Sequence, residues 1–194
     1  MTSPLSADHL RRALEETGAL ESGHFRLSSG LHSDRYIQCA RLLESPRLAG
    51  AAGAALADRL TPYEPDSILS PALGGVVIGY ATASALGVPF RFVERRHGAL
   101  RLRRGFRLSA GEKVAVVEDV VTTGGSAREA AEVAAAAEAQ VVAFGAIIDR
   151  TGGMASFPAP FANLLEVEVG TFEPGGCPLC VLGEPMTAPG SRGT

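Results

Sequence analysis

Cysteine is scarce in this sequence. The 194 residues contain only three cysteines, Cys39, Cys177 and Cys180, an odd number that is too small for the disulfide framework of a compact secreted domain. Cys177 and Cys180 have CxxC spacing, but the pattern includes no second pair and no assigned histidine partner. The pair is therefore a weak indication of zinc binding and a weaker one of redox activity.

Long apolar runs are missing as well. No stretch approaches the roughly 20 apolar residues that a membrane-spanning helix needs. The opening residues, MTSPLSADHLRRALEE, read as the polar beginning of a helix and not as a basic region followed by an apolar one. We therefore expect a cytoplasmic protein that does not bind membranes.

Positive charge is low overall but locally concentrated. The net charge is -3 at pH 7 and the pI is about 5.8, which argues against general nucleic-acid binding, and we expect no nucleic-acid partner. Six arginines nevertheless fall between Arg95 and Arg107. This local excess predicts an anionic ligand.

The order of apolar segments predicts the fold class. The chain is 46% hydrophobic and 20% charged, which suits one globular domain over residues 1–194. Short apolar runs alternate with helical segments, a pattern typical of an α/β protein with a mostly parallel central sheet flanked by helices. Ligands of such sheets bind at the carboxyl ends of the strands. The expected strands are 67–69, 89–93, 114–118 and 141–149, the expected helices are 6–17, 49–60, 127–139 and one ending near 85, and 171–194 is expected to be an irregular tail.

The stretch VAVVEDVVTTGGSA, residues 114–127, places two acids after an apolar run. Beyond the acids, Gly124 and Gly125 can adopt positive φ and turn the chain into a helix, where backbone N–H groups form a phosphate cradle. Two carboxylates would repel a phosphate, so they must face vicinal hydroxyls or a magnesium ion. A sugar phosphate would fit both the phosphate cradle and the two carboxylates. The alternative interpretation is that the acids belong to the N-cap region of a helix and bind no ligand.

This stretch resembles the phosphoribosyl-pyrophosphate (PRPP) motif of type I phosphoribosyltransferases. The resemblance implies that family's fold, with a small N-terminal hood and a flexible basic lid loop. It also implies that Glu118 and Asp119 hold the ribose hydroxyls, with Asp119 catalytic, and that residues 122–127 hold the 5′-phosphate. The implied PRPP-binding residues here are Glu118, Asp119, Val120, Val121, Thr122, Thr123, Gly124, Gly125, Ser126 and Ala127.

A second glycine turn follows the strand at 67–69. The pair Gly74 and Gly75 allows close backbone approach to an anion, although such pairs are often ordinary turn residues. In the resembled family a loop at this place binds pyrophosphate and commonly contains a non-proline cis peptide bond. The implied pyrophosphate-binding residues are Ala72, Leu73, Gly74 and Gly75.

The arginine-rich segment FVERRHGALRLRRGFR, residues 92–107, has two interpretations. Arginines can clamp phosphate oxygens, and a loop that closes can exclude water, so the segment suits a lid. The alternative is a solvated β-hairpin whose charges only maintain solubility. His97 is a possible proton donor or phosphate partner, but a single surface histidine is more often neither.

Over nearly the whole chain the sequence resembles the orotate phosphoribosyltransferase family. The resemblance rests on the hood segment FRLSSGLHSDRYIQ (25–38), the lid beginning at Glu94, Asp149 and Arg150 at a strand end, and the tail segments CPLC (177–180) and PGSR (189–192). Many members have lysines in the lid and one before the hood's Ser-Gly, whereas this chain has arginines and Ser28, and its only lysine is Lys113. The implied orotate-binding residues are Thr122, Arg150, Ser29 and Tyr36, and the implied catalytic lid residues are Arg95, Arg96 and His97.

The resemblance further implies substrates, cofactor and assembly. PRPP and orotate are the implied substrates, and Mg²⁺ is implied as a cofactor held mainly through PRPP, without direct protein ligands. A homodimer is implied in which lid residues reach the neighbouring site. The hood is expected to comprise about 1–45 plus a C-terminal segment, and the core about 46–170. Two alternatives remain: a purine phosphoribosyltransferase, and a PRPP-binding regulator that reads RNA.

Overall fold

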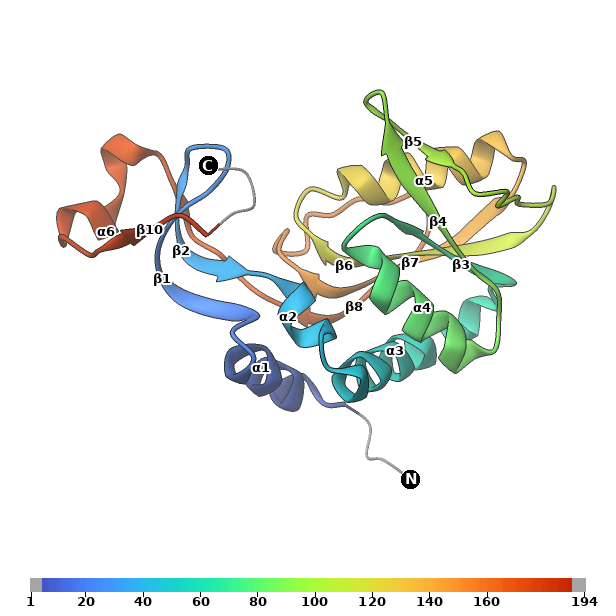
Figure 1. Ribbon diagram of the computed structural model, residues 1–194, viewed down its shortest axis with the longest axis horizontal. Coiled ribbons are helices and arrows are strands. Elements are labelled where there is room, and N and C mark those ends of the chain that lie inside the picture. The colour runs from blue at the N-terminus through green and yellow to red at the C-terminus, as the bar shows by residue number, and fades with distance from the viewer. Residues whose placement is uncertain (1–4, 190–194) are drawn as a thin grey trace.

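The structure is a computed structural model that describes residues 5–189. Residues 190–192 of the PGSR segment lie outside this range. The core is a six-stranded sheet in the order β5-β4-β3-β6-β7-β8, in which every neighbouring pair is parallel except β4 with β5 (Figure 1). The strands are β3 (Ser67–Pro71), β4 (Phe90–Arg96), β5 (Ala99–Leu102), β6 (Lys113–Val121), β7 (Gln140–Asp149) and β8 (Phe161–Glu166).

Helices cover both faces of this sheet, as the alternating sequence pattern predicts. Figure 1 shows α3 (Pro46–Leu60) and α4 (Gly75–Leu86) on one side and α5 (Gly125–Ala136) on the other. Two apolar clusters correspond to the two faces, one with α3 residues such as Leu56 and one with α5 alanines such as Ala130. The helices of residues 5–189 lack the combination of length and apolar character needed to cross a membrane.

A second, smaller sheet combines the two ends of the described chain. Its order is β10-β1-β2-β9, so the hairpin of β1 (Leu20–Arg26) and β2 (His32–Ile37) is flanked by the C-terminal strands β10 (Met186–Thr187) and β9 (Thr171–Phe172). In Figure 1 this hood stands beside the core sheet. The remaining elements are α1 (Ala7–Glu16), α2 (Cys39–Leu43), α6 (Pro178–Val181) and the short 3₁₀ turns Thr61–Tyr63 and Pro174–Gly176.

The predicted elements are confirmed, with shifted boundaries. Ser6 caps α1 by accepting a hydrogen bond from the His9 amide (3.3 Å), and Ser45 caps α3 by accepting one from the Leu48 amide (3.4 Å). Strand β6 is longer than predicted and includes both acids, because its pairing with β7 continues to Val121. The expectation of an irregular tail is corrected, because its described part contains β9, α6, β10 and a 3₁₀ turn.

The arginine-rich segment forms the hairpin that the second interpretation described. Antiparallel pairing runs from Val93 with Leu102 to Arg96 with Ala99, and His97 and Gly98 turn the chain with positive φ. Figure 1 shows the hairpin projecting from the edge of the sheet near α5. The segment is therefore an ordered β-hairpin at the edge of the core sheet.

Candidate active site

The two acids of β6 are partly buried near the carboxyl end of the core sheet. Both side chains follow the fully buried run Val114–Val117. Burial raises the pKa of Glu118 to about 7, and the neighbouring Asp119 carboxylate adds to this rise. Burial also raises the pKa of Asp119, although hydrogen bonds from the backbone amides of Val120 and Asp119 oppose the shift. Two carboxylates held in this way carry an electrostatic penalty that a ligand with hydroxyl or cationic groups would relieve.

The turn after β6 has the geometry of an anion cradle. Gly124 adopts φ +74°, and Gly125 is already the first residue of α5, so only the first of the two glycines uses positive φ. A side chain at Gly124 would lie 2.9 Å from the Phe157 ring. Arg128 fixes the turn by donating to the Thr123 carbonyl (2.6 Å). The first amides of α5 therefore lie next to the acids of β6.

The second glycine turn lies against the first motif. A Cβ added at Gly74 would come within 2.6 Å of Asp119 Oδ1, and one at Gly75 within 2.9 Å of the Val117 carbonyl oxygen. The Ala72–Leu73 peptide bond is cis, as the family resemblance implies. The Ala72 amide donates to the Val93 carbonyl (2.8 Å), while Leu73 is 85% exposed. Tertiary packing thus joins two loops that are about 45 residues apart into one site.

Arg150 lies at the end of the neighbouring strand. Its amide donates to the Val121 carbonyl (2.9 Å), which places it beside the end of β6. Burial lowers the pKa of Arg150, and the carboxylate of Asp34 in the hood opposes that shift. The Nε atom is buried without a hydrogen-bond partner among residues 5–189. A buried guanidinium nitrogen of this kind calls for an anionic acceptor.

Some of the predicted PRPP-binding residues have side chains that pack in the core, away from the expected ligand. Val121 and Ala127 are buried in the core, so only their backbone groups are available to a ligand. Val120 packs against the larger apolar cluster. Thr122 and Thr123 are exposed, and Ser126 is half-buried at the beginning of α5.

The predicted lid and hood residues lie on two hairpins: Arg95 and Arg96 end β4, and the hood residues lie on the β1–β2 hairpin. Arg95 forms an ion pair with Glu129 of α5 (2.9 Å) and donates to the Gly98 carbonyl (2.7 Å). Arg96 and His97 are exposed on the hairpin. Ser29 lies in the turn at the tip of the β1–β2 hairpin, and Tyr36 lies near its base, 5.8 Å from Phe25 between ring centroids. Their roles stay predictions.

Two features of the site were not found from the sequence. Asp34 approaches Arg150 because its own carboxylate accepts the Gly170 amide (2.8 Å), which holds β2 against the chain leaving β8. Arg128 supports the cradle from α5, and its guanidinium also lies 5.9 Å from the Phe157 ring centroid. Asp34 lies within the hood segment 25–38, which gives it no specific role, and no sequence motif links Arg128 to the site.

Comparison with known proteins agrees with this geometry. The family model described as "Phosphoribosyl transferase domain" matches residues 39–168, a range that contains both glycine loops, the acids and Arg150. The fold is the type I phosphoribosyltransferase fold: an α/β fold with a mostly parallel sheet and flanking helices. The fold and the strand-end motif thus define a protein of the phosphoribosyltransferase class.

The similar proteins narrow this class. Orotate phosphoribosyltransferase of Thermotoga maritima is 50% identical over 184 residues, which cover 95% of this chain and 98% of that protein. The protein of the same name from Caldicellulosiruptor bescii is 45% identical over 188 residues, covering 97% and 99%. The crystal structure of orotate phosphoribosyltransferase from Aeropyrum pernix matches with a TM-score of 0.70 and 25% identity, covering 81% of this chain and 93% of that chain. The chain belongs to the orotate phosphoribosyltransferase family.

The raised pKa of Glu118 leads to a prediction about stability. The folded-state pKa of about 7 exceeds the ordinary value, so the folded chain binds the proton more tightly than the unfolded chain. Folding stability therefore falls as the pH rises from about 4.5 to 7, and the whole penalty is present above that range. Glu118→Gln removes the charge and should raise the free energy of unfolding at pH 8 by about 1–2 kcal/mol, a value reduced for partial exposure.

Thermal unfolding at pH 5 and pH 8 measures this effect. The melting temperature of Glu118→Gln should exceed that of the wild type by roughly 5 °C at pH 8 and by much less at pH 5. Glu132→Gln, which makes the same change at an exposed position of α5, serves as the control and should show no such pH dependence. Equal shifts at both pH values would rule out a buried, proton-binding Glu118.

Proposed function

We propose that this protein is a pentosyltransferase that transfers the 5-phosphoribosyl group of PRPP to orotate. The N1 atom of orotate loses its proton and forms a bond to the anomeric carbon of the ribose, while the bond from that carbon to pyrophosphate breaks. The products are orotidine 5′-monophosphate, pyrophosphate and the released proton. The reaction belongs to the de novo biosynthesis of UMP. The observation that carries the proposal is the close approach of the Gly74 loop to Asp119, the acid before the TTGGS turn, with Arg150 at the adjacent strand end.

The two loops divide PRPP between them. In the proposed complex the turn at residues 122–127 binds the 5′-phosphate through the first amides of α5 and the hydroxyls of its threonines and serine. Glu118 and Asp119 accept hydrogen bonds from the ribose hydroxyls. Residues 72–75 bind the pyrophosphate, and the small size of Gly74 lets this loop approach Asp119.

Arg150 is proposed to bind the carboxylate of orotate. The buried, unpartnered Nε supports this role, because a guanidinium offers two parallel donors to a carboxylate. Thr122 follows β6 next to the Arg150 backbone and is proposed to bind the pyrimidine ring. Ser29 and Tyr36 would complete the base site from the hood, near Asp34.

The family is consistent with a metal cofactor, and we propose Mg²⁺. PRPP oxygens would hold the ion, which would neutralise charge on the departing pyrophosphate. This arrangement leaves the partly buried carboxylates of Glu118 and Asp119 free to accept hydrogen bonds from the ribose hydroxyls. The chain's own share is to orient the two reactants and to stabilise an oxocarbenium-like transition state with the Asp119 carboxylate.

A homodimer is proposed in which the arginine hairpin of one chain contributes to the site of its neighbour, as the family resemblance implies. Leu73, Val77 and Tyr80 are 85%, 46% and 65% exposed. Val77 and Tyr80 are three residues apart on one side of α4, and Leu73 lies in the loop just before this helix. A second copy that covers this apolar strip would border the pyrophosphate loop. Its Arg95, Arg96 and His97 could then act in trans.

The charge-introducing variant Tyr80→Glu tests the dimer. The wild type should sediment as a dimer at micromolar concentration, and Tyr80→Glu should sediment as a monomer with kcat reduced roughly tenfold or more, since each site would lose the partner's cations. Ala135→Glu on the opposite side of the sheet is the matched control and should remain dimeric. A wild-type protein that is fully active and entirely monomeric would refute the shared site.

The activity assay is the loss of orotate absorbance in the presence of PRPP and Mg²⁺. Hypoxanthine, adenine and uracil are supplied in parallel reactions. Consumption of orotate alone is expected. Consumption of a purine would indicate a purine phosphoribosyltransferase, and PRPP binding without consumption of any base would indicate a regulator.

A further inference from the structure

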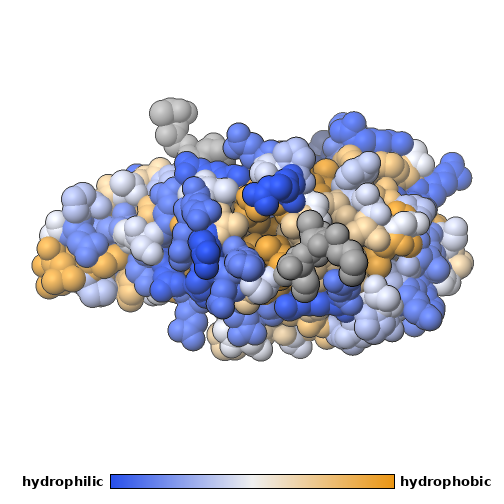
Figure 2. Space-filling view, turned by 90° about the horizontal axis from the view of Figure 1, so that it is seen from below, coloured by the Kyte–Doolittle hydropathy of each residue, from blue (hydrophilic) through white to orange (hydrophobic). Residues whose placement is uncertain are grey.

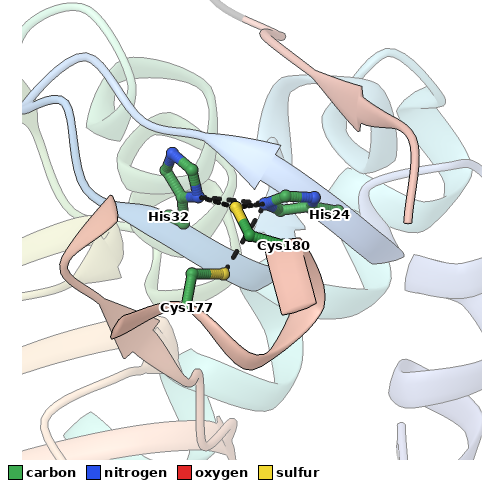
Figure 3. A group of neighbouring side chains, drawn as sticks. All are labelled: His24, His32, Cys177 and Cys180. Carbon is green, nitrogen blue, oxygen red and sulfur yellow. Dashed lines mark hydrogen bonds between the residues drawn. The ribbon is translucent and has the colours of Figure 1, made fainter. Parts of the chain in front are cut away.

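Four side chains with metal-binding atoms meet in the hood, away from the site described above. His24 lies on β1, His32 begins β2, and Cys177 and Cys180 flank the beginning of α6. Figure 3 shows the two imidazoles and the two sulfurs pointing toward one another. One ligand atom from each residue lies within 4.8 Å of the others, and three of the four residues are buried.

The distances between these atoms fit a tetrahedral ion. A zinc ion with Zn–N of about 2.0–2.1 Å and Zn–S of about 2.3 Å separates its ligands by about 3.3 Å between nitrogens and about 3.5 Å between nitrogen and sulfur. The observed separations are 3.0 Å from His24 Nε2 to His32 Nδ1, 3.6 Å from His24 Nε2 to Cys177 Sγ, and 3.3 Å from His32 Nδ1 to Cys180 Sγ. A small central ion accounts for all of them.

The orientation of His24 supports the same conclusion. Its Nδ1 lies 2.9 Å from the carbonyl oxygen of Glu184, so that nitrogen carries the proton and donates it to the carbonyl. The lone pair of Nε2 is then directed at the cluster. A backbone carbonyl that fixes the tautomer in this way is the usual second contact of a metal-bound histidine. Glu184 lies in the same C-terminal segment as the cysteines.

The C-terminal segment lacks an apolar core that could hold it in place. Cys177 is the single buried residue between 171 and 189. Val181 and Leu182 of α6 are 86% and 72% exposed, and Figure 2 shows a hydrophobic patch at the end of the molecule where α6 lies. Pairing of β10 with β1 covers only two residue positions. A segment so poorly buried requires another source of stability, such as a metal ion.

We propose that His24, His32, Cys177 and Cys180 bind one Zn²⁺ ion, which fastens the C-terminal segment to the β1–β2 hairpin. Two thiolates and two imidazoles form a ligand set that suits zinc. Binding releases the thiol protons of the two cysteines to solvent and changes no oxidation state. All four positions of the tetrahedron are filled by protein, so the site is structural and leaves no place for a reacting water.

Metal content measures the proposal directly. The full-length protein, purified without chelators and then supplied with ZnCl₂ and desalted, should contain one zinc per chain. Cys180→Ser and His32→Ala should each lose most of this zinc. Cys39→Ser and His9→Gln change a cysteine and an exposed histidine outside the cluster, and both should retain it. Protein that takes up no zinc, or variants of the cluster that retain it, would overturn the proposal.

Two further measurements keep the test independent of folding and of activity. Co²⁺ added to the metal-free wild type should give the visible absorption bands of tetrahedral cobalt and a charge-transfer band from the thiolates. In Cys180→Ser this charge-transfer band should be weaker. Limited proteolysis after zinc removal should cut the chain between residues 173 and 187 while the core remains intact. If freshly purified protein held no metal and its mass showed a Cys177–Cys180 disulfide, the zinc proposal would be wrong and the two cysteines would be a redox pair.

Discussion

Asp119→Asn should lower kcat by about 10²–10³ without unfolding the protein, because the substitution removes the carboxylate proposed to face the developing positive charge of the ribose. The amide has nearly the same shape, so the contact with Gly74 is preserved. Burial already disfavours the charged form of Asp119, as its raised pKa indicates, and neutralising it should not reduce stability.

Steady-state kinetics test the predicted fall in kcat, and PRPP binding and thermal unfolding test whether the variant remains folded. Asp58→Asn on the exposed side of α3 makes the same chemical change outside the site, and its kcat should match the wild type. A kcat for Asp119→Asn within about threefold of the wild type would contradict the assigned role, whatever the effect on KM.

Arg150→Gln is expected to raise the KM for orotate about 100-fold while the KM for PRPP changes little. The side chain is proposed to pair with the orotate carboxylate, and loss of such a charged, buried pair costs on the order of 2–3 kcal/mol. Arg150→Lys should restore only part of this affinity, because an ammonium group does not reproduce the planar pair of donors.

The KM values for orotate and for PRPP test the role of Arg150 separately. Arg59→Gln, an exposed arginine of α3, is the matched control and should leave both KM values unchanged. If Arg150→Gln weakened PRPP and orotate equally, the residue would be supporting the end of β6 and would not be contacting the base.

Local sequence predicted most of the core and its principal motif. The apolar runs of β3, β6 and β7 are bounded by glycine turns, and the parallel strands bring their carboxyl ends to one edge of the sheet without further information. The acids, the TTGGS turn and Arg150 therefore meet as the sequence predicts. Strand pairing beyond Glu118 and the exclusive use of positive φ by Gly124 required the structure, since both depend on neighbouring chain segments.

The structure of the arginine-rich segment could not be predicted from its local sequence. Its composition suits a lid and a hairpin equally, and the choice depends on partners that lie elsewhere in the chain. Glu129 of α5 pairs with Arg95, and Glu94 pairs with Arg104 (2.9 Å) across the base of the hairpin. Exposed ion pairs of this kind contribute little stability, so the proposed contact of the hairpin with pyrophosphate would require only a small free energy to break them.

The sequence alone predicted the glycine turn after the paired acids and the α/β core, because each depends on residues adjacent in the chain or on the regular alternation of strands and helices. The proposed zinc site could not be recognised in this way. His24 is separated from Cys177 by 153 positions, and the CxxC pair gains its histidine partners only when the C-terminal strands join the β1–β2 hairpin. The CxxC spacing is the part of this ligand set with a local signal, and folding in three dimensions is what brings the histidines to it.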